Sequence, residues 1–151
     1  MKTQKLLLVS FFLICLFPLI IIAQDISVHS MIGKTRSDVI RKYGKPVHQD
    51  NSNPAMICMF YQPSAKRLIF VSDNDGVYQS EATASYDTEQ TARDQVDEII
   101  NTSVSDGFVS DTISTHDFQL YKTGVKADLQ LKENKISKKF EVSIKARRSE
   151  D

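Results

Sequence analysis

Residues whose chemistry could support catalysis or metal binding are few in this 151-residue sequence, and they are scattered. Residues 72–76 (SDNDG) place two aspartates and a glycine in the order of a calcium-binding loop. In the register of an EF-hand loop, however, Val71 would hold the first ligand position and Ala82 the twelfth, so both essential oxygen ligands are missing. Turns select the same residue types. We therefore predict a hairpin turn here and expect neither a metal nor another cofactor.

The other reactive residue types do not form a recognisable catalytic set. The three histidines, whose spacing suggests no ligand set, are His29, His48 and His116. His116 precedes Asp117 and could be an oriented base, but adjacent residues on a strand point to opposite faces. Cys58 lies in an apolar run, where a lone cysteine is usually a small buried hydrophobe. We predict that the protein is not an enzyme; the alternative is a small exported enzyme or ligand-binding protein with a cleft near His116 and Asp117 or near Cys58.

Residues 1–23 are predicted to be a secretory signal peptide. A basic start is followed by a long apolar run, and the small residue Ala23 precedes the polar Gln24 at the predicted cleavage site. The alternative is an uncleaved N-terminal membrane anchor, because about 18 apolar residues can just span a bilayer. Cys15 follows the large apolar residues 12–14 instead of a small one, so we expect no lipid on it. The protein is therefore predicted to be exported, to the periplasm or the medium.

Residues 24–151 have the length of one domain. Once Lys2 and Lys5 are removed, the formal net charge is about −2, which gives no electrostatic reason to expect nucleic acid or an anionic membrane as a partner. After cleavage no integral membrane span is expected. Cys58 is then the one remaining cysteine in the sequence, so no intramolecular disulfide can form. Stability must come from packing.

Two helices and seven strands are predicted in this domain. The first helix begins at Thr35, whose hydroxyl can cap the first turn together with Asp38, and it ends at Gly44 before Pro46. The second helix begins near residues 87–88 and ends at residues 106–107. Apolar runs and alternation predict strands at residues 55–62, 66–72, 77–86, 108–114, 117–122, 125–131 and 136–146.

The predicted order of elements is therefore α-βββ-α-ββββ. The simplest assembly is an α+β fold in which two helices pack on one face of a mainly antiparallel sheet. Each helix is followed by a meander of strands, so the domain can be divided into two degenerate half-repeats, residues 32–86 and 87–146.

The stretch IGKTRSDVIRKYGKP, followed by an apolar strand pair and an Asp-Gly turn, resembles the Gly-x-Thr…Val…Gly-x-Pro segment of the SmpA/OmlA-like proteins of bacterial envelopes. That fold is similar to the repeats of the secreted beta-lactamase inhibitor protein. The resemblance covers about residues 32 to 80, and its matching positions are Gly33, Thr35, Val39, Gly44, Pro46, Phe70 and Gly76. It implies a binding module, with a role in envelope assembly or inhibition. This chain lacks the lipid-bearing cysteine of the SmpA/OmlA-like proteins.

The first two predicted strands are apolar on both faces, unlike the strands near the C-terminus. With helices on one face, the other face would expose an apolar patch of the kind that marks a partner site. We predict the partner-binding face to be Ile57, Met59, Tyr61, Ile69 and Val71. The alternative is that these strands are covered on both sides, by the second helix, the N-terminal segment or a dimer mate. The predicted function is an exported, non-catalytic module that binds another envelope or secreted protein.

Overall fold

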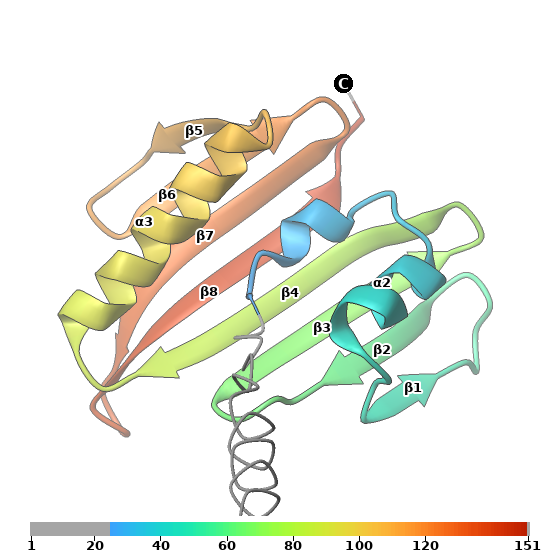
Figure 1. The fold of residues 1–151 in the computed structure, drawn as a ribbon, viewed down its shortest axis with the longest axis horizontal. Coiled ribbons are helices and arrows are strands. Elements are labelled where there is room, and N and C mark those ends of the chain that lie inside the picture. The colour runs from blue at the N-terminus through green and yellow to red at the C-terminus, as the bar shows by residue number, and fades with distance from the viewer. Residues whose placement is uncertain (1–24, 151) are drawn as a thin grey trace, which may run out of the picture.

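The computed structural model describes residues 25–150, which form one eight-stranded antiparallel sheet with the strand order β1-β2-β3-β4-β8-β7-β6-β5 (Figure 1). The strands are β1 (His48–Asp50), β2 (Ile57–Tyr61), β3 (Lys66–Asp73), β4 (Gly76–Tyr86), β5 (Val109–Thr112), β6 (Asp117–Lys122), β7 (Val125–Asn134) and β8 (Lys139–Arg148). The helices are the 3₁₀ turn η2 (Val28–Met31), α2 (Arg36–Tyr43) and α3 (Glu89–Ser105). The predicted signal peptide, residues 1–23, lies outside the described residues. Within them, no helix is both long and apolar enough to cross a bilayer.

The predicted element order, α-βββ-α-ββββ, is wrong, because four strands and not three follow the first helix. The additional strand is β1, which lies in the polar stretch after the first helix. All three of its residues are exposed, and it forms by backbone pairing with β2, where His48 lies opposite Phe60. A short polar edge strand has no hydrophobic alternation, so its sequence pattern resembles that of a loop. The fold is accordingly richer in strand than the prediction.

The two halves of the fold have the same order of elements. One half is α2 followed by β1 to β4, and the other is α3 followed by β5 to β8. They join side by side through β4 and β8, which pair antiparallel at the centre of the sheet, so that Ala82 lies opposite Ile144. Figure 1 shows α2 and α3 on the same face of the sheet, each over its own half, with η2 between them. No helix covers the other face within residues 25–150.

Helix α2 has the ends that the sequence predicts. The Thr35 hydroxyl accepts from the Asp38 backbone N–H at 3.2 Å, and the Asp38 carboxylate accepts from the Thr35 N–H at 3.0 Å, which completes a capping box. Gly44 ends the helix with φ +80°. The helix buries Tyr43, whose ring lies 5.1 Å from Phe70 in β3 between ring centroids.

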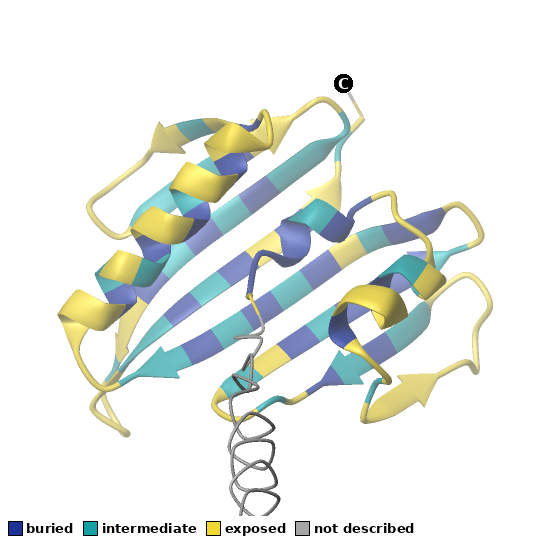
Figure 2. Ribbon diagram, in the orientation of Figure 1, coloured by how far each residue is buried: buried dark blue, intermediate teal, exposed yellow. Residues whose placement is uncertain are grey.

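Residues 25–32 form an N-terminal strap that lies between α2 and α3, over the central strands β4 and β8 (Figure 1). The strap is defined by four buried apolar side chains, which are Ile26, Val28, Met31 and Ile32. Ser80 in β4 donates its hydroxyl hydrogen to the Val28 carbonyl oxygen at 3.0 Å, in a fully buried bond. Figure 2 shows η2 as a mainly dark, buried segment lying across the sheet between two helices whose outer faces are exposed.

Candidate functional site

The five residues of the predicted partner-binding face do not share one face of the sheet. Ile57, Met59 and Tyr61 alternate with their neighbours along β2 and lie on the helix side. Met59 is 0% exposed and Tyr61 is 3% exposed. The Tyr61 ring packs at 6.0 Å from Tyr43 of α2, between ring centroids. These two residues belong to the hydrophobic core, so their side chains are not accessible to a partner.

Ile69 and Val71 lie on the opposite, uncovered face. The register of β2 and β3 places Phe60 opposite Ile69 and Cys58 opposite Val71. Directly opposed residues of an antiparallel pair project from the same side of the sheet. The sequence shows which residues of one strand alternate, but it does not show how two strands align, and this is why the predicted set combined the two faces.

Cys58, Phe60, Ile69 and Val71 therefore make up an apolar patch on the uncovered face. Val71 is 9% exposed, and the other three side chains are half-buried. The His48 ring of the edge strand lies 5.6 Å from the Phe60 ring, between centroids, and extends the patch to the edge. The patch is a continuous apolar surface of β2 and β3, on the face of the sheet that no helix of residues 25–150 covers.

Charged and polar side chains predominate on the rest of this face. Glu81 of β4 lies 3.7 Å from Arg67 of β3 and 3.7 Å from Lys145 of β8, between charged atoms. Beyond them is an open hollow of about 350 Å³, lined by residues that include Asp117, Asp128 and Lys145. Asp128 accepts a hydrogen bond from the Gln119 side chain at 3.2 Å. The uncovered face thus has an apolar half and a polar half.

The Cys58 thiol belongs to the apolar patch. Burial raises its pKa, and the Asp50 carboxylate on β1 raises it further. Its sulfur lies 3.9 Å from the Met56 carbonyl oxygen. A thiol with a raised pKa carries less thiolate at neutral pH, and the thiolate is the nucleophilic form.

His116 and Asp117 have separate partners. Arg93 of α3 can only donate, so His116 Nε2 accepts from Arg93 Nη2 at 3.0 Å and His116 Nδ1–H donates to Thr115 Oγ1 at 2.8 Å. Asp117 accepts the hydroxyl hydrogen of Ser114 at 2.8 Å. Four strands separate β2, which carries Cys58, from β6, which begins at Asp117. The structure does not bring the residues of the enzyme alternative together.

The SDNDG segment forms the turn between β3 and β4. Asp73 Oδ1 accepts from the Asp75 backbone N–H at 2.8 Å, and Asp73 Oδ2 lies 3.5 Å from Arg148. Both carboxylate oxygens of Asp73 therefore have protein partners. Among the described residues, no three His, Cys, Asp or Glu side chains lie where they could hold one metal ion.

His29 is the chemically informative residue whose place the sequence did not reveal. It lies in the strap, 2% exposed, with its ring edge-on to Phe108 at 4.9 Å between centroids. Burial lowers its pKa to about 4. The one sequence signal is that His29 stands among apolar residues just before the first helix, a pattern that exposed loops also show.

Comparisons with known proteins give no family for this chain. No family model and no curated protein matches it. One similar solved structure is an extracellular protein containing a SCP domain from Bacillus anthracis, with 12% identity and a TM-score of 0.47, covering 84% of this chain and 47% of that one. Another is a cysteine-rich secretory protein from Staphylococcus aureus, with 12% identity and a TM-score of 0.46, covering 80% of this chain and 45% of that one. The chain thus spans about half the length of each.

The predicted resemblance to SmpA/OmlA-like proteins and to the repeats of the beta-lactamase inhibitor protein is contradicted. The similar structures are a protein containing a SCP domain and a cysteine-rich secretory protein, and no family model supports the resemblance. The matching residues have local explanations in this fold. Thr35 caps α2, Gly44 ends it, and Gly76 opens β4 with φ +112°, features that a capped helix followed by a hairpin needs in any protein.

Proposed function

We propose that this protein is an exported, non-catalytic binding module that presents the apolar patch of its uncovered sheet face to another protein. The observation that carries the proposal is that Cys58, Phe60, Ile69 and Val71 form one apolar surface on the face that no helix of residues 25–150 covers. Continuous apolar surface of this kind is typical of interaction sites when polar residues surround it. Export is proposed from the signal-peptide pattern of residues 1–23.

The edge strands of the sheet favour a partner that binds to the sheet face over a partner that adds a strand to an edge. Both edge strands are short: β1 has three residues and β5 has four. β1 ends in Asp50, and β5 contains Asp111. Short, charged edges are how sheets avoid pairing with other chains. A partner therefore gains more from the side chains of the face than from the backbone of an edge.

The test is site-specific photo-crosslinking, because it reports which face a partner touches. A photoreactive phenylalanine analogue replaces Phe60 in one sample and Gln130, on the polar half of the same face, in the other. We expect a discrete cross-linked protein from the envelope fraction or medium with the probe at position 60 and none at position 130. Equal cross-linking at both positions, or none at either, would contradict the proposal.

Binding of the captured protein is then measured with two double variants. Phe60→Thr/Ile69→Thr removes the apolar contact and keeps strand-compatible side chains. Gln130→Thr/Ser143→Thr changes an opposed pair of β7 and β8 on the polar half and is the matched control. We expect at least a tenfold loss of affinity in the first variant and less than a twofold change in the second, with both folded by circular dichroism. Unchanged affinity in the first variant means that the partner binds elsewhere.

A further inference from the structure

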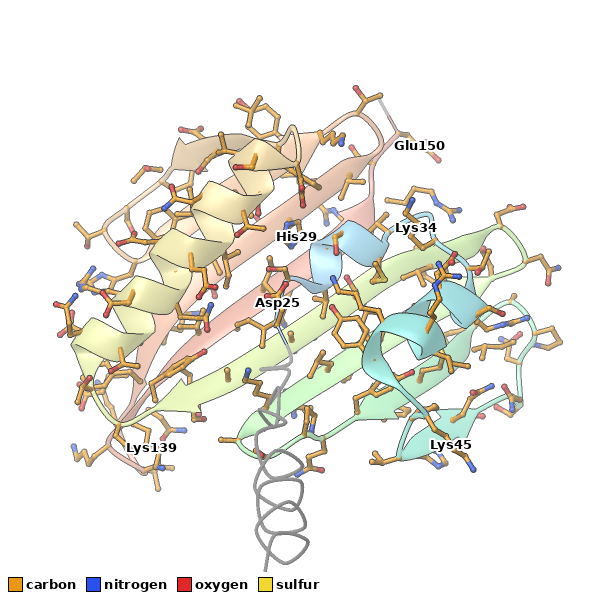
Figure 3. The ribbon with its side chains drawn as sticks, in the orientation of Figure 1. Asp25, His29, Lys34, Lys45, Lys139 and Glu150 are labelled. Carbon is orange, nitrogen blue, oxygen red and sulfur yellow. The ribbon has the colours of Figure 1, made fainter. Side chains whose placement is uncertain are left out.

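His29 fastens the strap to helix α3. Its Nε2 atom lies 2.8 Å from the hydroxyl oxygen of Ser103, which is itself 1% exposed. Ser103 also lies 2.6 Å from the Ile99 carbonyl oxygen, one turn back in the helix. Figure 3 shows the His29 side chain in the space between η2 and α3. This buried polar contact joins the strap to the half of the fold that contains α3.

The direction of these hydrogen bonds fixes the state of the imidazole. A carbonyl oxygen can only accept, so Ser103 must give its one hydroxyl hydrogen to Ile99. Ser103 is then the acceptor toward His29, and Nε2 carries the ring proton. Nδ1 is left as a bare lone pair, buried and without a hydrogen-bond partner within residues 25–150. A proton added there would create a charge and a donor with no acceptor, and both are costly in an apolar setting.

The charges around His29 do not compensate for this cost. Asp25 in the strap and Asp106 at the end of α3 favour the protonated ring, whereas Lys42 of α2 disfavours it. Lys34 and Lys122 line a hollow of about 370 Å³ next to the ring, together with Asp106. Lys122 donates to the Asp106 carbonyl oxygen at 2.7 Å. Burial outweighs the two carboxylates, so the strap is seated with a neutral histidine.

We propose that the strap, residues 25–32, is an acid-released cover, which leaves its place between α2 and α3 when His29 takes up a proton and so uncovers the seam between β4 and β8. Once released, the imidazole is solvated and holds its proton as an ordinary histidine does. The strap is the element that can respond alone, because it lies over the sheet, ahead of the first strand in the sequence, and is not one of the paired strands. Release would expose apolar residues of the strap together with the small side chains beneath it. The proposal does not depend on the proposed use of the opposite face.

The size of the response follows from the two protonation equilibria. With a ring pKa of about 4 in the seated strap and 6.5 in the released strap, acidification from pH 7 to pH 4.5 favours release by about 60-fold. The released fraction increases as the pH falls from about 6.5 toward 4 and changes little outside that window.

The experiment is amide hydrogen exchange of the purified protein at pH 7 and pH 4.5, corrected for intrinsic exchange rates. The Val28 and Ile32 amides, which bond within the strap, report release, and the amides of β7 and β8 report the core. We expect protection of the strap amides to fall by up to about 60-fold on acidification while the core amides stay protected. The variants are His29→Gln, which keeps a donor but cannot titrate, and His116→Gln, which removes an exposed histidine as the matched control.

Acid loss of strap protection in the unmodified protein and in His116→Gln, but not in His29→Gln, supports the proposal. Loss of strap and core protection together overturns it, and so does an acid response in His29→Gln equal to that of the unmodified protein. If His29→Gln does not fold, the ring is followed by NMR in the unmodified protein. A ring that titrates in step with strap exchange supports the proposal, and a ring that titrates while the strap stays protected overturns it.

Discussion

Replacing Gly76 by alanine is expected to lower the free energy of unfolding, because Gly76 at the start of β4 packs against the backbone of residues 33–34, just after the strap. Gly76 has φ +112°, and a Cβ atom there would lie 2.7 Å from the Lys34 carbonyl oxygen and 3.2 Å from that of Gly33. The same backbone makes two hydrogen bonds with Val77, from Gly33 N–H at 2.7 Å and to Lys34 O at 2.9 Å. The added methyl group therefore meets backbone atoms that cannot rotate away.

The expected loss in the free energy of unfolding is about 3 to 5 kcal/mol. A non-glycine residue at such a φ costs roughly 1 to 3 kcal/mol. Relief of the contact requires the Gly33–Lys34 segment to move from Val77, which weakens two hydrogen bonds worth about 1 kcal/mol each. Domains of this size have a total stability of roughly 5 to 15 kcal/mol, so the change is large.

Equilibrium unfolding in urea, followed by circular dichroism, measures this loss, and Gly124→Ala is the matched control. Gly124 also has a positive φ, +78°, but a Cβ atom there would have nothing within 4 Å. Its replacement is expected to cost about 1 kcal/mol, from backbone conformation alone. Equal losses in the two variants would refute the argument that the contact with Lys34 restricts position 76 to glycine.

Three further predictions concern separate parts of the fold. The unmodified protein should lose up to about 2.5 kcal/mol more stability than His29→Gln between pH 7 and pH 4.5 in urea titrations, because the unfolded chain binds a proton below about pH 6.5 and the folded one does so only near pH 4. Thr35→Ala should cost about 1 kcal/mol in the same assay, since the first turn of α2 loses its cap, and the loss should be absent if another group takes over the N–H of Asp38. Cys58 should react with a thiol reagent at neutral pH more slowly than in the urea-unfolded chain, because burial raises its pKa; equal rates would contradict its place in the patch.

Helix α2 shows where local signals in the sequence are sufficient. Thr35 and Asp38 lie three residues apart, and Gly44 acts on the last turn of the same helix. The predicted capping box and the positive φ at the predicted helix end are both present. Such features depend on the backbone of one short segment and need no tertiary partner. This is why the ends of this helix could be predicted while the arrangement around it could not.

The apolar patch shows where local signals are insufficient. Alternation along β2 correctly separates Met59 from Phe60, but two strands can be aligned in either of two parities without any change in their own patterns. The choice is made by the register, which pairs Phe60 with Ile69, and by helix α2, which buries Tyr61. Both are interactions between residues that are far apart in the sequence. The same limit applies to β1, whose three exposed residues form a strand because their backbone pairs with β2.

The strap explains how a sheet of two equal halves can be closed on its helix side. Helices α2 and α3 each lie over their own half, which leaves the β4–β8 seam between them to be covered (Figure 1). The register forms a row of small side chains across the seam, with Ser80 opposite Ala146 and Ala146 opposite Ala127. All three are buried, and Ser80 bonds the strap at Val28. Small residues let the strap approach the sheet closely, so the seam is covered by eight residues of chain in place of a third helix. The His29 contact with Ser103 is one of the polar contacts that hold the strap, and the strap is not one of the paired strands of either half. This is the physical basis for expecting the strap to respond to acid before the sheet does.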